Sequence, residues 1–178
     1  MRPLTLFALV ATALACDGST PLSVPGDPNL VQSSNAPVNS ITGGGKVDVT
    51  SVWPGAVDAT ISLGARVNGE GVATGELQAH FSVPDEKVHM EITCLSVNGN
   101  EAWIGGTVTH SHPSGNLLGN VYIVRFQDNE QGADAAPDRM SVFRSGGLPG
   151  PARCLNRPSG SPEFDLLFPF VAGNVQIR

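Results

Sequence analysis

The sequence predicts an all-β protein: a single antiparallel domain of about eight strands, either a small barrel or a β-sandwich, after a signal peptide and a disordered tether. Two observations support this class. From about residue 42, apolar and polar residues alternate with the period of two that half-buried strands require. Short turns rich in Gly, Asn and Pro separate these segments, as in an antiparallel meander. We expect a signal peptide at 1–15, a linker at 16–41 and the all-β domain at 42–178.

The first fifteen residues have the features of a lipoprotein signal peptide. Arg2 supplies one positive charge, and the apolar run at 4–15 is too short to span a bilayer, which needs about 20 residues. An Ala-Leu-Ala motif ends this run, and Cys16 follows directly, where bacterial lipoproteins carry their lipid. We expect palmitate or a similar chain on Cys16 to anchor the exported protein to the cell envelope, in the periplasm or at the cell surface. The alternative is ordinary signal cleavage and a freely secreted protein.

The segment at 16–41 has the composition of a flexible linker. Ser, Pro, Asn and Gly dominate it, and it sustains no structural period. A coil of about 25 residues spans roughly 25–30 Å on average, which would hold the domain clear of the membrane surface.

The cysteine count fits an oxidising compartment. The chain has three cysteines, and lipidation of Cys16 leaves Cys94 and Cys154 as a pair. In exported proteins such a pair commonly forms a disulfide. A bond across a loop of about 60 residues stabilises the fold by roughly 4 kcal/mol in the chain-entropy model. The alternative is two buried free thiols.

Eight segments are expected to form the strands, and turns separate them. They lie at residues 46–50, 57–67, 75–83, 88–94, 102–109, 120–127, 138–144 and 173–178. The Asn-Gly pairs at 68–69 and 98–99 predict tight hairpin turns, because glycine supplies the positive φ that such turns need. The residues at 121–124 are apolar on both faces, which indicates a central strand.

The strand at 88–94 departs from simple alternation near its end. The period places Cys94 on the core face. Leu95 and Val97 are out of phase, which indicates a β-bulge or a second covered face.

The last third of the chain contains a Gly- and Pro-rich excursion at 145–162, which holds Cys154. A disulfide would hold this excursion against the sheet. The apolar stretch at 164–171 follows, and we expect it to cap one end of the core or to form an edge strand broken by Pro169.

Several phrases of the domain occur in a recognisable order. They are Gly43-Gly44-Gly45 before a strand, Gly69-x-Gly71-x-x-x-Gly75-x-Leu77, Asn98-Gly99-x-x-Ala102-x-Ile104-x-Gly106, Phe126-x-Asp128-Asn129-x-x-Gly132-x-Asp134, and the ending Gly173-Asn174-Val175-Gln176-Ile177. Together they resemble a small all-β domain that recurs in exported bacterial surface proteins and lipoproteins. The resemblance covers residues 41–178. It implies an all-β fold outside the cytoplasm, and it supplies no reaction and no catalytic residues.

The charge of the chain limits its partners. The formal net charge is −6, and removal of the signal, whose only charge is that of Arg2, changes it from −6 to −7. A mildly acidic protein lacks the basic patch that nucleic acid requires. We expect a monomer that meets the membrane through its anchor, with an envelope protein or a small ligand as partner.

The acidic loop after the strand at 120–127 is a candidate calcium site. It contains Asp128, Asn129, Glu130, Asp134 and Asp138. Calcium takes six to eight oxygen ligands, and carboxylates clustered at a glycine-containing turn supply them. The alternative is a solvated turn whose Asp and Asn side chains bond their own backbone.

A second metal hypothesis concerns the histidines. His110 and His112 lie on one face of a predicted strand, a spacing that can bind zinc or copper, and His80 or His89 would be a third ligand. The sequence does not place these residues together. The alternative is a set of exposed polar residues before the turn at Pro113.

The sequence contains no arrangement typical of nucleophilic catalysis, such as G-x-S-x-G, so we expect no enzyme activity. Trp53, Trp103 and Tyr122 are candidates to line a ligand cavity, or else ordinary core residues. We expect a non-catalytic structural or recognition role in the cell envelope. The alternatives are a small-molecule or lipid carrier on a closed barrel, and a calcium-binding surface module. A large apolar interior pocket would favour the carrier, and a filled core would favour the interaction module.

Overall fold

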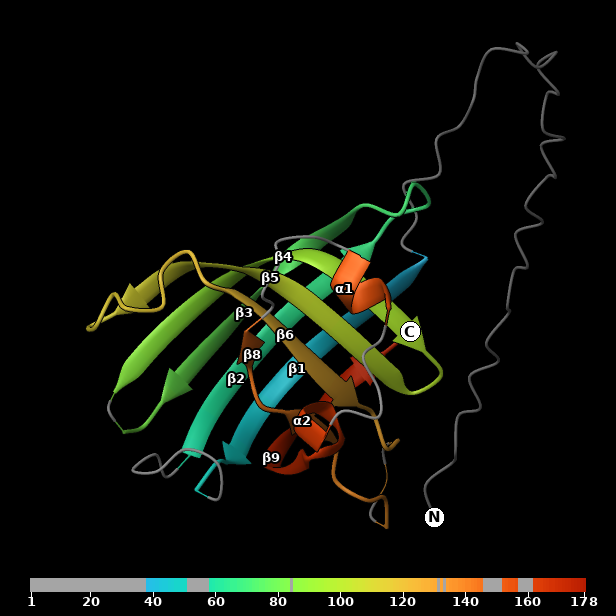
Figure 1. Cartoon of the computed structure of the whole chain (residues 1–178). Coiled ribbons are helices and arrows are strands. Elements are labelled where there is room, and N and C mark those ends of the chain that lie inside the picture. The colour runs from blue at the N-terminus through green and yellow to red at the C-terminus, as the bar shows by residue number, and fades with distance from the viewer. Residues whose placement is uncertain are drawn as a thin grey trace, which may run out of the picture. The chain divides into compact units, whose positions relative to one another are not determined.

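The computed structural model describes residues 38–50, 58–83, 85–130, 132, 134–145, 152–156 and 162–178 (Figure 1). They belong to a compact unit at Ser34–Arg178. The predicted signal peptide, Cys16 and most of the predicted linker lie outside the described residues. In the described part of the chain, helices are too short to cross a membrane.

The described residues form nine strands and two helices (Figure 1). The strands are β1 (Asn39–Asp48), β2 (Asp58–Val67), β3 (Ala73–Phe81), β4 (Glu86–Asn98), β5 (Glu101–His112), β6 (Val121–Gln127), β7 (Arg139–Ser141), β8 (Arg144–Ser145) and β9 (Leu167–Ile177). The helices are α1 (Ala152–Leu155) and α2 (Pro162–Asp165). Each helix has four residues, about one turn, so neither produces a helical period in the sequence.

The strands close into an antiparallel barrel, which confirms the predicted fold class and selects the barrel over the sandwich. Each strand from β1 to β6 pairs with the next, β7 pairs with β6 and β9, and β9 pairs with β1. β7 and β8 both pair with β6 and together take one place in the wall, so the described wall has eight strand positions. The turns predicted at 68–69 and 98–99 join β2 to β3 and β4 to β5.

β1 begins earlier than the sequence predicts. The linker was expected to extend to residue 41 and the first strand to occupy 46–50, whereas β1 spans Asn39–Asp48. The three glycines at 43–45 therefore lie inside the strand, where they hide its alternation because they carry no side chain. A Cβ atom at Gly44 would lie 2.1 Å from the carbonyl oxygen of Ile61 on β2. Glycine here lets the two backbones approach closely as the wall curves.

The barrel interior is packed with apolar side chains from all parts of the wall. The fully buried members include Ile41, Leu77, Ile104, Val124, Phe126 and Val175. In β2 and β3 the buried positions alternate with exposed ones, as the period-two pattern predicts.

A β-bulge in β4 divides the core into two clusters. Ile92 and Cys94 occupy successive pairing positions opposite β5, so Thr93 is an extra residue. Ile92 and Leu95 consequently both face the barrel interior. Cys94 belongs instead to a second buried cluster, formed with Trp103, Ile123, Cys154 and Phe164. The prediction that Cys94 faces the barrel core is wrong because the bulge reverses the phase, while the predicted bulge and second covered face are both present.

The predicted disulfide between Cys94 and Cys154 is present. The two residues are 60 positions apart in the sequence, and their Cα atoms are 6.1 Å apart. Cys154 belongs to α1, which contacts β4 and β5 (Figure 1). The bond therefore holds α1, the part of the excursion around Cys154 that the structure describes, against the sheet, as expected.

β9 differs from the prediction for the end of the chain. The apolar stretch at 164–171 was expected to form a cap or an edge strand, and 173–178 a separate strand. A single strand, Leu167–Ile177, includes most of both and lies between β7 and β1. Pro169 is tolerated because it pairs only with β7, and pairing with β1 begins at Phe170.

Candidate functional site

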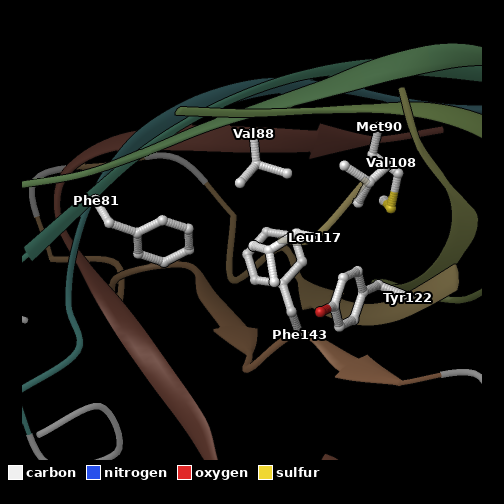
Figure 2. A pocket seen from close by; sticks show the side chains of 7 residues that line it. All are labelled: Phe81, Val88, Met90, Val108, Leu117, Tyr122 and Phe143. Carbon is white, nitrogen blue, oxygen red and sulfur yellow. The ribbon is translucent and has the colours of Figure 1, made fainter. Parts of the chain in front are cut away.

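Two small apolar spaces lie among the described side chains of the barrel interior. The first has a volume of about 10 Å³, and Figure 2 shows the side chains that point into it: Phe81, Val88, Met90, Val108, Leu117, Tyr122 and Phe143. The second, of about 20 Å³, also reaches Val47, Ile61, Met140 and Phe168. A site needs about 10–15 Å³ by this measure to hold one water molecule. Each space therefore has room for about one water molecule, and the described side chains fill the barrel.

Phe81 and Phe143 lie between the two spaces, because both rings line each of them. Their ring centres are 6.0 Å apart and their planes meet at 67°. Phe143 also meets Tyr122 edge-on, with ring centres 6.1 Å apart. Such aromatic pairs contribute roughly 0.5–1.5 kcal/mol beyond the area they bury. Phe143 is only partly buried and lies between β7 and β8, so its displacement would join the two spaces.

The loop between β5 and β6 is fastened to the barrel by Glu86, which is 6% exposed. The Ser111 hydroxyl donates to Glu86 Oε1 at 2.5 Å, and the Ser114 backbone N–H donates to Oε2 at 3.2 Å. The Leu117 N–H donates to Ser111 Oγ at 3.4 Å, and the Leu117 side chain packs against the core. The hydrogen bond from Ser111 holds the pKa of Glu86 below its usual value, although burial acts in the opposite direction. This carboxylate is not among the site residues that the sequence predicts.

The acidic loop closes the seam beside β9. Asp138 is buried, and its Oδ2 accepts the Val175 N–H at 2.7 Å, while its Oδ1 accepts the Asn129 N–H at 2.8 Å. Asp128 Oδ2 accepts the Ile177 N–H at 3.0 Å. β7 pairs only with residues 167–169 of β9, so these carboxylates bind backbone N–H groups that the β7 ladder does not reach.

The five calcium candidates are not gathered around one point. Glu130 N–H donates to Asp128 Oδ1 at 3.0 Å, and Asn129 Nδ2 donates to the Pro137 carbonyl at 2.7 Å, which is the self-bonded turn of the alternative hypothesis. Glu130 and Asp134 are exposed. Among the residues that the structure describes, no group of three or more His, Cys, Asp or Glu side chains is placed to hold a metal ion. A surface hollow of about 250 Å³ adjoins this loop.

The histidines that sequence analysis could not place together share one exposed face. His80 lies on β3, His89 on β4, and His110 and His112 on β5. His89 pairs directly with His110, and their ring centres are 5.2 Å apart. The rings of His110 and His112 are nearly parallel, with centres 6.3 Å apart. We call these four residues the histidine face.

His80 has a carboxylate partner, Asp85. Its Nε2 lies 2.7 Å from Oδ1 of Asp85, and this hydrogen bond holds the pKa of Asp85 below its usual value. Beside His80 and His89 the surface is hollowed over about 190 Å³, and Lys87 and Gln78 also line this hollow. The histidine face therefore borders a concave surface.

Arg125 joins the second cluster to α2. Its guanidinium carbon lies 5.3 Å from the centre of the Trp103 ring, and the group forms an ion pair with Glu101. It also donates to the Phe164 carbonyl at 3.1 Å and lies 3.5 Å from the Asp165 carboxylate. These contacts give Trp103 a structural role outside the barrel interior.

The three aromatic residues proposed to line a cavity thus have different positions. Tyr122 lines the interior space of Figure 2. Trp103 belongs to the second cluster. Trp53 lies outside the described residues.

Comparison with protein-family models, curated proteins and solved structures finds no match for this chain.

Proposed function

We propose that this chain is an exported bacterial lipoprotein whose barrel has a non-catalytic structural or recognition role in the cell envelope. The observation that supports this role most directly is the filled interior, whose two spaces have volumes of about 10 and 20 Å³. A drug-sized ligand needs a pocket of roughly 300–1,000 Å³. The outer surface is then the part of the domain that meets a partner.

Two features support the exported location. The Cys94–Cys154 disulfide suits an oxidising compartment. The sequence at 1–16 has the order of a lipoprotein signal followed by its cysteine. A barrel on a linker from Cys16 would stand clear of the membrane and expose its outer wall to neighbouring molecules.

The intact mass of the protein purified from membranes of its native host tests the anchor. We expect a chain that begins at Cys16 and carries a diacyl or triacyl increment, with a rise of about two daltons on reduction of one disulfide. An unlipidated chain would remove the anchor from the proposal and favour a freely secreted domain.

A carrier of a small apolar ligand is the second candidate, and the two spaces on either side of Phe81 and Phe143 favour it. Titration with the fluorescent apolar probe N-phenyl-1-naphthylamine distinguishes the candidates. The carrier requires saturable binding of one probe per chain, and Phe143→Ala, which enlarges the space, should strengthen it. The recognition role predicts no saturable binding by the wild-type chain.

A further inference from the structure

The histidine face contains every histidine of the chain, which has four. They come from three adjacent strands, and their side chains are exposed. In the grid of the sheet, His89 lies opposite His110, and Lys87 separates His80 from His112. Imidazole nitrogens therefore gather on one patch of a barrel that has a net negative charge.

A second β-bulge creates this patch. His89 pairs with His110, but the next pair is Met90 with Val108, so Thr109 is the extra residue of β5. Val108 is buried in the barrel core. Without the bulge, strict alternation would place His110 on the same face as Val108. The extra residue turns His110 outward, beside His89.

The distance between His89 and His110 is suited to a shared metal ion. Two imidazoles bound to one ion at about 2.0–2.1 Å with a tetrahedral angle have ring centres roughly 5 Å apart. The observed separation is 5.2 Å. His112 adds a third ring beside His110, with a centre-to-centre distance of 6.3 Å.

We propose that the histidine face binds a divalent transition metal ion, zinc or copper, through His89 and His110. His112 is positioned to become a third ligand. Imidazole nitrogen suits zinc and copper, whereas calcium and magnesium take oxygen ligands. The described side chains do not form a ready set of three ligands, so binding uses the direct pair first and recruits His112 by rotation of its exposed side chain. This site goes beyond the proposed envelope role and does not depend on it.

The surrounding charges support a weak, accessible site. Lys87 lies in the neighbouring row of the sheet, between His80 and His112, and its positive charge opposes a cation. Glu91 lies on the exposed face of β4 two residues from His89, and its negative charge favours one. The neighbouring hollow of about 190 Å³ leaves space for water or another small ligand on the metal. The ion would thus keep open coordination positions, in contrast to the closed sites of structural zinc.

Metal titration of the full chain, purified without a polyhistidine tag, tests the proposal. Isothermal titration with zinc chloride and with copper(II) chloride gives the stoichiometry and the affinity. We expect one ion per chain, and electron paramagnetic resonance of the copper form should show at least two nitrogen ligands. His89→Gln and His110→Gln should each weaken binding by about tenfold or more, the equivalent of one lost ligand.

His80→Gln is the matched control, because it removes an exposed histidine of the same face whose Nε2 already has Asp85 as partner. It should change the affinity by less than about threefold. In free energy, this is less than half of the effect of a tenfold change in affinity. His112→Gln should have an effect between these limits. The proposal is overturned if the His89→Gln/His110→Gln double variant binds as tightly as the wild type, or if His80→Gln weakens binding as much as His89→Gln.

Discussion

Two parts of the barrel wall differ in what covers their outer surface. The wall of β4, β5 and β6 has buried side chains on both faces, and α1 and α2 lie over the outer one, with the disulfide holding α1. The wall of β2 and β3 has a single buried face, and its other side chains point to solvent. Alternation of apolar and polar residues therefore marks the wall with one exposed face, whereas in the wall covered on both faces a bulge at Thr93 turns Cys94 to the outer cluster.

Loss of the disulfide should lower the stability of the fold more than any other change considered, because it removes the covalent link between β4 and α1. Cys154→Ser opens the covalent loop of 60 residues, for which the chain-entropy model gives about 4 kcal/mol. Denaturant unfolding of the purified domain measures the loss. The Cys94→Ser/Cys154→Ser double variant should match the wild type under reducing conditions. Equal stability of oxidised and reduced wild type would show that packing alone holds the cover.

In the wall of β2 and β3, alanine substitutions at two glycines test whether close backbone approach requires glycine at one of them. A Cβ atom at Gly75 would lie 2.1 Å from the Gly64 carbonyl oxygen, and the φ of Gly75 is +148°. Gly75→Ala should therefore cost roughly 3 kcal/mol from strain and overlap. At Gly64 a Cβ atom meets nothing within 4 Å, so Gly64→Ala is the control and should be neutral or slightly stabilising. Equal costs in thermal unfolding would contradict the argument.

The seam beside β9 belongs to neither wall and depends on carboxylates. Asp138→Ala leaves the backbone N–H groups of Val175 and Asn129 without their partner, which should cost about 2 kcal/mol. Asp134→Ala removes an exposed carboxylate of the same loop and should cost little. Urea unfolding measures both changes. Hydrogen exchange of the Val175 amide should accelerate only in Asp138→Ala. An unchanged rate in that variant would contradict the hydrogen bond from Val175 to Asp138.

The smallest predicted effect is on the stability of the fold at acidic pH. The folded pKa of Glu86 is lowered by the Ser111 hydrogen bond, so its carboxylate stabilises the fold above the unfolded pKa of about 4.3, and this stability is lost as pH falls through the folded pKa. Glu86→Gln should remove this part of the pH dependence below about pH 4.3 and loosen the β5–β6 loop. Ser111→Ala should flatten the same region of the curve. Unchanged acid unfolding in both variants would contradict the role of Glu86.

The sequence predicted best where one face of a strand is apolar and the other polar. β2 and β3 were expected at 57–67 and 75–83 and are found at Asp58–Val67 and Ala73–Phe81. The disulfide was predictable because only two cysteines remain once Cys16 is set apart. In β1 the three glycines have no side chain that would show which face of the sheet they are on, so the predicted start of this strand is too late in the sequence.

The remaining features depend on contacts that no local pattern contains. The bulges at Thr93 and Thr109 each add one residue, and they decide which way Cys94 and His110 point. The role of Glu86 arises from residues that lie 25 and 28 positions away in the sequence. The strand expected at 138–144 is interrupted by a bulge, so that β7 and β8 are separate. The grouping of the histidines likewise follows from register.

Native mass spectrometry of the chain extracted from membranes of its host tests most directly whether the barrel is a solid scaffold or a container. The proposed role predicts that the native mass, apart from bound metal, equals the mass of the denatured, lipidated chain, because the interior spaces of about 10 and 20 Å³ hold no apolar molecule. One apolar molecule per chain, retained in the native state and released on denaturation, would contradict this account and establish the carrier in its place.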